Sequence, residues 1–485
     1  MAERKIIQLL RSFSRSELIE FQKFIASEYI NPRPELVRLM EGLAEYAPEF
    51  ASEAVDYEQL YAGAFPDESY NENRLTKKLF YLNKLAEQFV LFESAKNQPM
   101  ENSFVLLHYY NSRKLPSLFL HQLKECYKLW EKIAHPSSRD YNWYYMIEME
   151  YSNFLLRNNH LKGSANLEVA TKALDAYFLQ EKLKLGTAMV SRQNIVNTTY
   201  KLPLLESLEE FLADKIDAYI PEIRVWFSAL QLTRMPQSEE HFSRLKTMVL
   251  SNIDKLGAGD SSALLILLQN TARYIYPEDE QYYSVMYSLY HTQIEHGLLF
   301  QNGALLPGLV NNIVTTGLKL GKLAWAEDFL EKYKDYIPEE YRQNTYWYNL
   351  ANINFAQKAY PQTLAFLNRL EYQDPFFTLR IKRLQLKTYY ELQEWELLDT
   401  TINSSRVYLH RLEKISERYK ALNLLFVNSL SSLFKLRTCL EPSGGSDQTL
   451  DDLRSSIMEI PVLPERDWLM LKTGSFAVQH QERLR

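Results

Sequence analysis

The chain has 485 residues, of which only 14 are glycine, well below the roughly 7% share that is usual in proteins. Few glycines leave little material for tight hairpin turns, so this composition argues against sandwiches, propellers and glycine-rich nucleotide folds and predicts an all-α chain. The net charge is −6, and the first hundred residues hold 12 basic against 16 acidic side chains, so nucleic acid is not expected as a partner.

Residues 1–98 are predicted to form an N-terminal helical module. Ser14 followed by Glu17 matches a capping box, which marks the start of a helix. A second helix is expected near Pro34, because proline favours the first helical turn. A longer helix is predicted over residues 71–93, where leucines recur at helical spacing.

Helical pairs are predicted along the rest of the chain. From Tyr219 onward, candidate first helices follow one another at a spacing of roughly 35 to 43 residues, which is typical of helical-repeat arrays. The candidate first helices begin near Tyr141, Tyr219, Ser261, Ala304, Asn344, Leu379 and Ile415. A single helical hairpin cannot bury its apolar face, so successive pairs are expected to stack into a solenoid. Residues 99–303 are interpreted as degenerate repeats of this kind.

The clearest repeat begins at Trp347 and ends at Pro375, with the sequence WYNLANINFAQKAYPQTLAFLNRLEYQDP. Trp347 opens the stretch, and the small residue Ala351 follows about one helical turn later. Phe355 and Tyr360 are aromatic, and an Asp-Pro pair closes the stretch. In these features the segment resembles the tetratricopeptide repeat.

The resemblance implies that residues 304–440 form tetratricopeptide-like (TPR-like) repeats in a right-handed α-solenoid. Thr363 and Leu370 replace alanines that the family prefers, which implies looser packing and not a different fold. The neighbouring repeats match at fewer positions and are inferred mainly from their adjacency. A HEAT-like or irregular α-solenoid is the alternative architecture.

Residues 441–485 are predicted to hold a linker and a C-terminal cap. The linker is the stretch EPSGGSD, whose composition is typical of a connection without regular structure. The last apolar residues, Trp468, Leu469 and Leu471, are expected to cover the open end of the array, since terminal units of solenoids are atypical.

The sequence contains no convincing motif for catalysis, a cofactor or a metal. Ser243 and Lys246 match the first motif of the serine acyl-enzymes, but Ser243 falls inside a predicted helix and not at its start. Cys126 and Cys439 are too far apart to suggest a metal site or a disulfide framework, which is typical of a reducing cytosol. We therefore expect a chain that is not an enzyme and needs no cofactor.

A cytoplasmic location without membrane contact is also expected. The start of the chain lacks the apolar region of a secretory signal. The longest aliphatic run, residues 263–268, is far shorter than the roughly 18 residues that span a bilayer.

In the tetratricopeptide family, the first helices of successive repeats line a concave surface. Carried over to this chain, those positions predict a peptide-binding groove formed by Asn311, Asn312, Thr315, Tyr348, Asn349, Asn352, Phe355, Arg380, Arg383 and Lys387. Amides are suited to bonding an extended backbone and cations to pairing with its carboxylates, so an acidic extended segment is the expected ligand. A solvated polar face with ordinary charges is the alternative interpretation.

Alanine at the three groove cations, Arg380, Arg383 and Lys387, is expected to weaken partner binding with little loss of thermal stability.

The leading functional hypothesis is a non-catalytic scaffold or adaptor that binds a peptide segment or a partner subunit. The second is a peptide-sensing regulator whose N-terminal module is the output domain. The third is an enzyme whose site is not recognisable from sequence.

Overall fold

All regular secondary structure that the computed structural model describes is helical, which confirms the all-α class expected from the composition. The structure describes residues 4–51, 54–158, 166–195, 199–276, 280–300, 303–371, 375–412, 417–438, 446–460 and 463–484. No β-strand occurs within these ranges.

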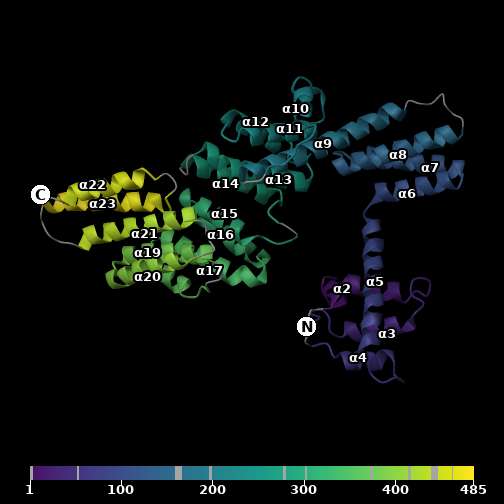
Figure 1. The fold of residues 1–485 in the computed structure, drawn as a ribbon, viewed down its shortest axis with the longest axis horizontal. Coiled ribbons are helices and arrows are strands. Elements are labelled where there is room, and N and C mark those ends of the chain that lie inside the picture. The colour runs from purple at the N-terminus through teal and green to yellow at the C-terminus, as the bar shows by residue number, and fades with distance from the viewer. Residues whose placement is uncertain are drawn as a thin grey trace. The chain divides into compact units, whose positions relative to one another are not determined.

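The N-terminal module consists of helices α1 to α5 (Figure 1). Their bounds are α1 (Lys5–Arg11), α2 (Arg15–Ile25), α3 (Pro34–Ala44), α4 (Tyr57–Ala64) and α5 (Glu72–Lys96). The predicted capping box is confirmed: the Glu17 amide donates to Ser14 Oγ at 3.2 Å, and the Ser14 amide donates to the Glu17 carboxylate at 2.7 Å. Pro34 occupies the first turn of α3, as expected.

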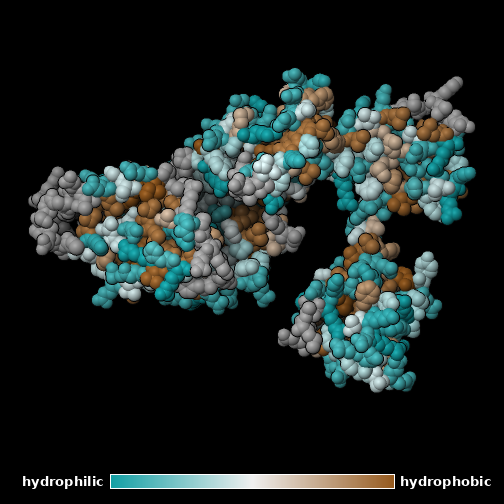
Figure 2. Space-filling view, viewed as in Figure 1, coloured by the Kyte–Doolittle hydropathy of each residue, from teal (hydrophilic) through white to brown (hydrophobic). Residues whose placement is uncertain are grey.

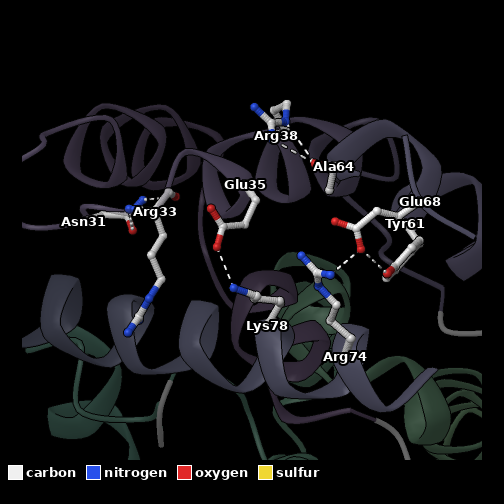
Figure 3. Close-up of polar contacts among 9 residues, drawn as sticks. All are labelled: Asn31, Arg33, Glu35, Arg38, Tyr61, Ala64, Glu68, Arg74 and Lys78. Carbon is white, nitrogen blue, oxygen red and sulfur yellow. Dashed lines mark hydrogen bonds and ion pairs between the residues drawn. The ribbon is translucent and has the colours of Figure 1, made fainter. Parts of the chain in front are cut away.

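Buried apolar side chains from α1 to α5 form one core. Polar contacts at its edge join helices that are distant in sequence (Figure 3). Lys78 Nζ of α5 pairs with the Glu35 carboxylate of α3 at 2.6 Å, and both side chains are largely buried. The Arg38 guanidinium donates to the Ala64 carbonyl at 2.9 and 3.1 Å, which joins α3 to the end of α4.

The next helices of the chain are α6 (Pro99–Ser112), α7 (Pro116–Glu131), α8 (Ser138–Arg157), α9 (Asn166–Ile195) and α10 (Leu205–Ala213), followed by a short 3-10 helix (Ile216–Ala218). Helices α6, α7 and α8 share a core in which the rings of Phe119 and Phe154 stack with centroids 4.2 Å apart. This core is separate from that of α1 to α5. The predicted boundary at residue 98 therefore falls between two cores.

The remaining helices are α11 (Pro221–Arg234), α12 (Glu239–Ser251), α13 (Ala258–Ile275), α14 (Glu280–Glu295), α15 (Pro307–Lys319), α16 (Leu323–Tyr333), a 3-10 helix (Lys334–Tyr336), α17 (Glu339–Ala356), α18 (Tyr360–Leu367), α19 (Pro375–Leu392), α20 (Trp395–Arg411), α21 (Glu417–Thr438), α22 (Ser446–Met458) and α23 (Arg466–Leu484). From α12 onward, each helix packs against the next one in the chain. Such sequential packing is the pattern expected of stacked helical hairpins.

The repeat that begins at Trp347 folds into the hairpin α17–α18, and the two helices pack together. Ala351 is fully buried at their contact, and Trp347 is half-buried in the same apolar cluster. The rings of Phe355 and Tyr360 lie across the turn with centroids 5.4 Å apart. The hairpin and its small-residue contact are thus present, while membership of the tetratricopeptide family stays a prediction.

Helices α15 and α16 come together at another small residue, Gly317. A Cβ atom there would lie 2.9 Å from the Trp325 ring and 3.0 Å from the Ala326 Cβ, so only glycine fits without a shift. The turn between the two helices contains Gly321 with a φ of +68°, a left-handed conformation that glycine adopts readily.

The C-terminal helices α22 and α23 pack against each other and against α21. Ile457, Leu463 and Leu469 join the core that contains Leu386 and Tyr390 of α19. This part of the chain therefore covers apolar surface at the end of the array, which is the arrangement expected of a cap. Asp374, Cys439 and positions 441–445 of the predicted linker lie outside the described residues.

The chain divides into two compact units. The first consists of Met1–Gly186 and Leu202–Ile223, and the second of Thr187–Lys201 and Arg224–Arg485. The predicted boundary at residue 98 lies inside the first unit, and those at 303 and 440 lie inside the second. Hydrophilic and hydrophobic side chains are mixed over the visible surface of each unit (Figure 2). In the part of the chain that the structure covers, no helix is long and apolar enough to cross a membrane.

Candidate functional site

The candidate site lies in the second unit, where polar side chains link the first helices of successive hairpins. Asn349 of α17 donates to Asn311 Oδ1 of α15 at 2.7 Å. Arg383 of α19 donates to Asn423 Oδ1 of α21 at 2.7 Å. Corresponding helices of neighbouring hairpins therefore place their polar residues side by side, as stacking requires.

Three cations follow one another along α19 at positions i, i+3 and i+7: Arg380, Arg383 and Lys387, here called the cation cluster. Aromatic rings from α17 lie beside them. Lys387 Nζ is 4.6 Å from the centroid of the Phe355 ring, a distance at which the ring face attracts an ammonium group. Tyr348 contributes a second ring of the same helix. Burial raises the pKa of its hydroxyl, and the charges of Arg383 and Arg380 only partly oppose that effect.

A carboxylate from the distant C-terminal segment occupies the cation cluster. Lys387 Nζ lies 2.6 Å from Glu465 Oε2, and Arg383 Nε lies 3.6 Å from Glu465 Oε1. The Lys387 and Arg383 side chains are only 10% and 15% exposed, whereas that of Glu465 is 28% exposed. Burial alone would raise the pKa of Glu465, but the charges of Lys387 and Arg383 outweigh it and lower the pKa to about 2.

Further polar contacts hold the segment around Glu465 in place. Glu391 of α19 accepts hydrogen bonds from Trp468 Nε1 and Lys472 Nζ, both at 2.7 Å. Asp467 pairs with Lys319 at the end of α15 at 2.6 Å. The start of α23 is thus joined to α19 at one side and to α15 at the other.

The predicted groove residues do not all face solvent. Asn311, Asn349 and Lys387 are buried, Asn312 and Thr315 are exposed, and Tyr348, Asn352, Phe355, Arg380 and Arg383 are half-buried. The structure brings together the residues of α17 and α19 around Glu465. The Lys387 ammonium group thus lies over the Phe355 ring, and the chain's own acid pairs with Lys387 and Arg383.

The asparagines require a correction. The amides of Asn311 and Asn349 bond to each other, and Asn349 also donates to the Thr345 carbonyl at 2.8 Å. Asn352 donates to the Tyr348 carbonyl at 2.8 Å. Asn311 and Asn349 are therefore enclosed where α15 meets α17, and the Asn352 amide bonds within α17, so these groups already have partners inside the protein.

The expectation for the alanine substitutions also needs correction. Removing Lys387 and Arg383 would leave the Glu465 carboxylate in a largely buried position without its cations. An unpaired buried charge is costly, so the substitution of the cations alone is expected to lower stability. Sequence reasoning missed Glu465 because it lies 78 residues after Lys387, and no local pattern relates the two positions.

Two other reactive side chains that the sequence singles out, Ser243 and Cys126, lie within helices. Ser243 lies in the middle of α12, as expected. Burial raises the pKa of the Cys126 thiol to about 11, so the thiolate form is scarce at neutral pH. Among the residues that the structure describes, no group of three or more histidine, cysteine or acidic side chains could hold a metal ion.

Comparison with protein-family models, with curated proteins and with solved structures gives no match to this chain. The function of the chain is therefore inferred from the geometry and the chemistry of the second unit.

Proposed function

We propose that this protein is a non-catalytic scaffold or adaptor that binds an acidic segment of a protein partner at the cation cluster. The supporting observation is the Glu465 carboxylate paired with Lys387 and Arg383, with the Lys387 ammonium group over the Phe355 ring. A partner carboxylate would use the same charge-assisted bonds. We retain the expectation, from its two separated cysteines, that it acts in the cytoplasm.

Affinity would have to come from several contacts. A single exposed ion pair contributes only about 0 to 1 kcal/mol, whereas partly desolvated pairs beside aromatic rings contribute more. The proposed ligand is therefore an extended peptide and not a single carboxylate.

The proposal is tested with the variant R383M/K387M/E465Q, which removes the Glu465 charge together with the two cations that pair with it. Because no unpaired charge is left behind, the fold is expected to remain within about 1 to 2 kcal/mol of the natural chain. The full-length protein is used to capture partners from the native host, and the captured protein is purified and titrated. At least a ten-fold loss of affinity is expected in the variant.

A charge-matched control, R244M/K255M/E327Q, changes two exposed cations and one exposed acid of the second unit. These positions lie outside α19 and the segment around Glu465, so partner affinity is expected to change little. Equal affinity of the purified partner for the natural chain and for the R383M/K387M/E465Q variant would contradict the proposal.

The second candidate is a regulator whose N-terminal module is the output domain. The observation that favours it is the core of α1 to α5, which is separate from the core of α6 to α8 within the first compact unit. Its acidic balance argues against DNA as the output target. Capture of a small effector peptide, in place of a stable protein partner, would favour this regulator over the scaffold.

A further inference from the structure

Glu465 is held in an unusual backbone conformation. Its φ is +58°, in the left-handed region that a non-glycine residue adopts only at a cost in free energy. Its carbonyl accepts from the Leu469 amide at 3.0 Å and so begins the hydrogen bonding of α23, while its carboxylate reaches Lys387 of α19. The chain therefore accepts a disfavoured conformation at the position that brings a carboxylate to the cation cluster.

The contact of Glu465 is separable from the packing of the C-terminal helices. That packing rests on Ile457, Leu463 and Leu469, which are buried, and on the bond from Trp468 to Glu391. The Glu465 side chain keeps contact with solvent, since 28% of it is exposed. A change of its side-chain rotamer would thus free the two cations and leave the apolar contacts of the helices intact.

We propose that Glu465 is a built-in competitor that occupies a carboxylate-binding site formed by Arg383 and Lys387, and that an acidic peptide of a partner replaces it. This inference rests on the proposed function and adds regulation of the same site. When no ligand is bound, Glu465 pairs with both cations. The apparent affinity for an acidic ligand is then the intrinsic affinity multiplied by the fraction of molecules in which Glu465 has moved away.

The test uses full-length protein and fluorescein-labelled hexaglutamate as the probe, with binding followed by fluorescence anisotropy at moderate salt. The variant E465Q removes the competing charge. It is expected to bind the probe at least about ten-fold more tightly than the natural chain, because the site no longer has an occupant. Labelled hexaglutamine, which lacks the carboxylates, is expected not to bind.

The matched control is E459Q, which removes an exposed acid of the same C-terminal segment and changes the net charge equally. It is expected to bind hexaglutamate as weakly as the natural chain does. If E465Q and E459Q bind the probe equally, or if E465Q binds hexaglutamine as well as hexaglutamate, the inference is wrong.

A second measurement covers the case in which E465Q is less stable. Saturating hexaglutamate should raise the thermal midpoint of E465Q by a few degrees, since a ligand that binds only the folded chain stabilises it. The midpoint of R383M/K387M/E465Q should not change. Absence of a rise in E465Q would also overturn the inference.

The two proposals can fail separately. If a native partner needs the cation cluster but binds the natural chain and E465Q with equal affinity, the scaffold function stands and competition by Glu465 is refuted. If E465Q gains hexaglutamate binding but no native partner depends on the cluster, the carboxylate site stands and the proposed scaffold function is refuted.

Discussion

Glu465 and Glu148 are acidic residues whose surroundings shift their pKa values in opposite directions. Glu465 faces two cations, which lower its pKa to about 2 despite burial. Burial raises the pKa of Glu148 of α8, and hydrogen bonds from Tyr127 and Tyr144 only partly oppose that effect. Because of this contrast, pH changes the contributions of the two residues to the free energy of unfolding in opposite directions.

Glu465 is expected to stabilise the fold most at neutral pH. Since its pKa is lowered on folding, its contribution is fully present above the ordinary value near 4.5 and is lost as the pH falls toward 2. The difference in unfolding free energy between the natural chain and E465Q should be on the order of 2 kcal/mol at pH 7. Chemical denaturation from pH 7 to 2 should show this difference shrinking; a constant difference would contradict the assignment.

Glu148 is expected to behave in the opposite way. A raised pKa means that the folded state favours the protonated acid, so stability is greatest below the ordinary pKa and is lost as the pH rises through the raised value. E148Q keeps a neutral group of similar shape and should gain on the order of 1 kcal/mol over the natural chain between pH 4 and pH 7. The control is E168Q, at an exposed position of α9, for which no such gain is expected.

At the scale of the helices, close contacts depend on small residues at defined positions. Ala351 lies at the contact of α17 with α18, and Gly317 lies at that of α15 with α16. In each hairpin a larger side chain would push the paired helices apart, because protein interiors leave little free volume.

G317A tests this interpretation for the hairpin α15–α16. The added methyl would meet the Trp325 ring at 2.9 Å, so the helices must shift, and the free energy of unfolding should fall by about 1 to 3 kcal/mol. G308A is the control in the same helix, because its Cβ would meet nothing within 4 Å. Thermal unfolding should leave G308A unchanged or slightly more stable, since alanine favours a helix over glycine. Equal midpoints for the two variants would rule out the close contact.

Local patterns were predictable from the sequence, and long-range pairings were not. The Ser14–Glu17 capping box involves residues three positions apart. Trp347 and Ala351 lie about one helical turn apart on the same face of one helix. Both patterns could therefore be recognised in the sequence. The bond between Asn311 and Asn349 joins different hairpins. The sequence could assign these asparagines to first helices but not decide how deeply stacking would enclose them.

On the scale of the whole molecule, composition and helical periodicity were sufficient to predict the all-α class and sequential packing. They could not predict Glu465, because its partners on α19 are set by how the C-terminal helices fold back on the array. The division into two units near residues 186–224 is similarly a property of contacts across many helices. No single linker in the sequence marks it.

The C-terminal helices are expected to be essential to the second unit. A chain ending at residue 445 lacks Ile457, Leu463 and Leu469, and it exposes the apolar surface of α19 that they cover. Each buried leucine or isoleucine contributes about 1.5 to 3 kcal/mol, so this truncation should lower the thermal midpoint of the second unit strongly and promote aggregation, as judged by size-exclusion chromatography.

A chain ending at residue 475 provides the matched comparison for that truncation. It keeps the buried apolar residues and the bonds from Trp468 and Lys472 to Glu391, so it should remain monodisperse with a midpoint near that of the full chain. Because this shorter deletion retains Glu465, it should also keep the low hexaglutamate affinity of the natural chain. If the chain ending at 445 were as stable as the one ending at 475, the C-terminal helices would not act as a cap. In the full chain, their packing would then not hold Glu465 in place against α19.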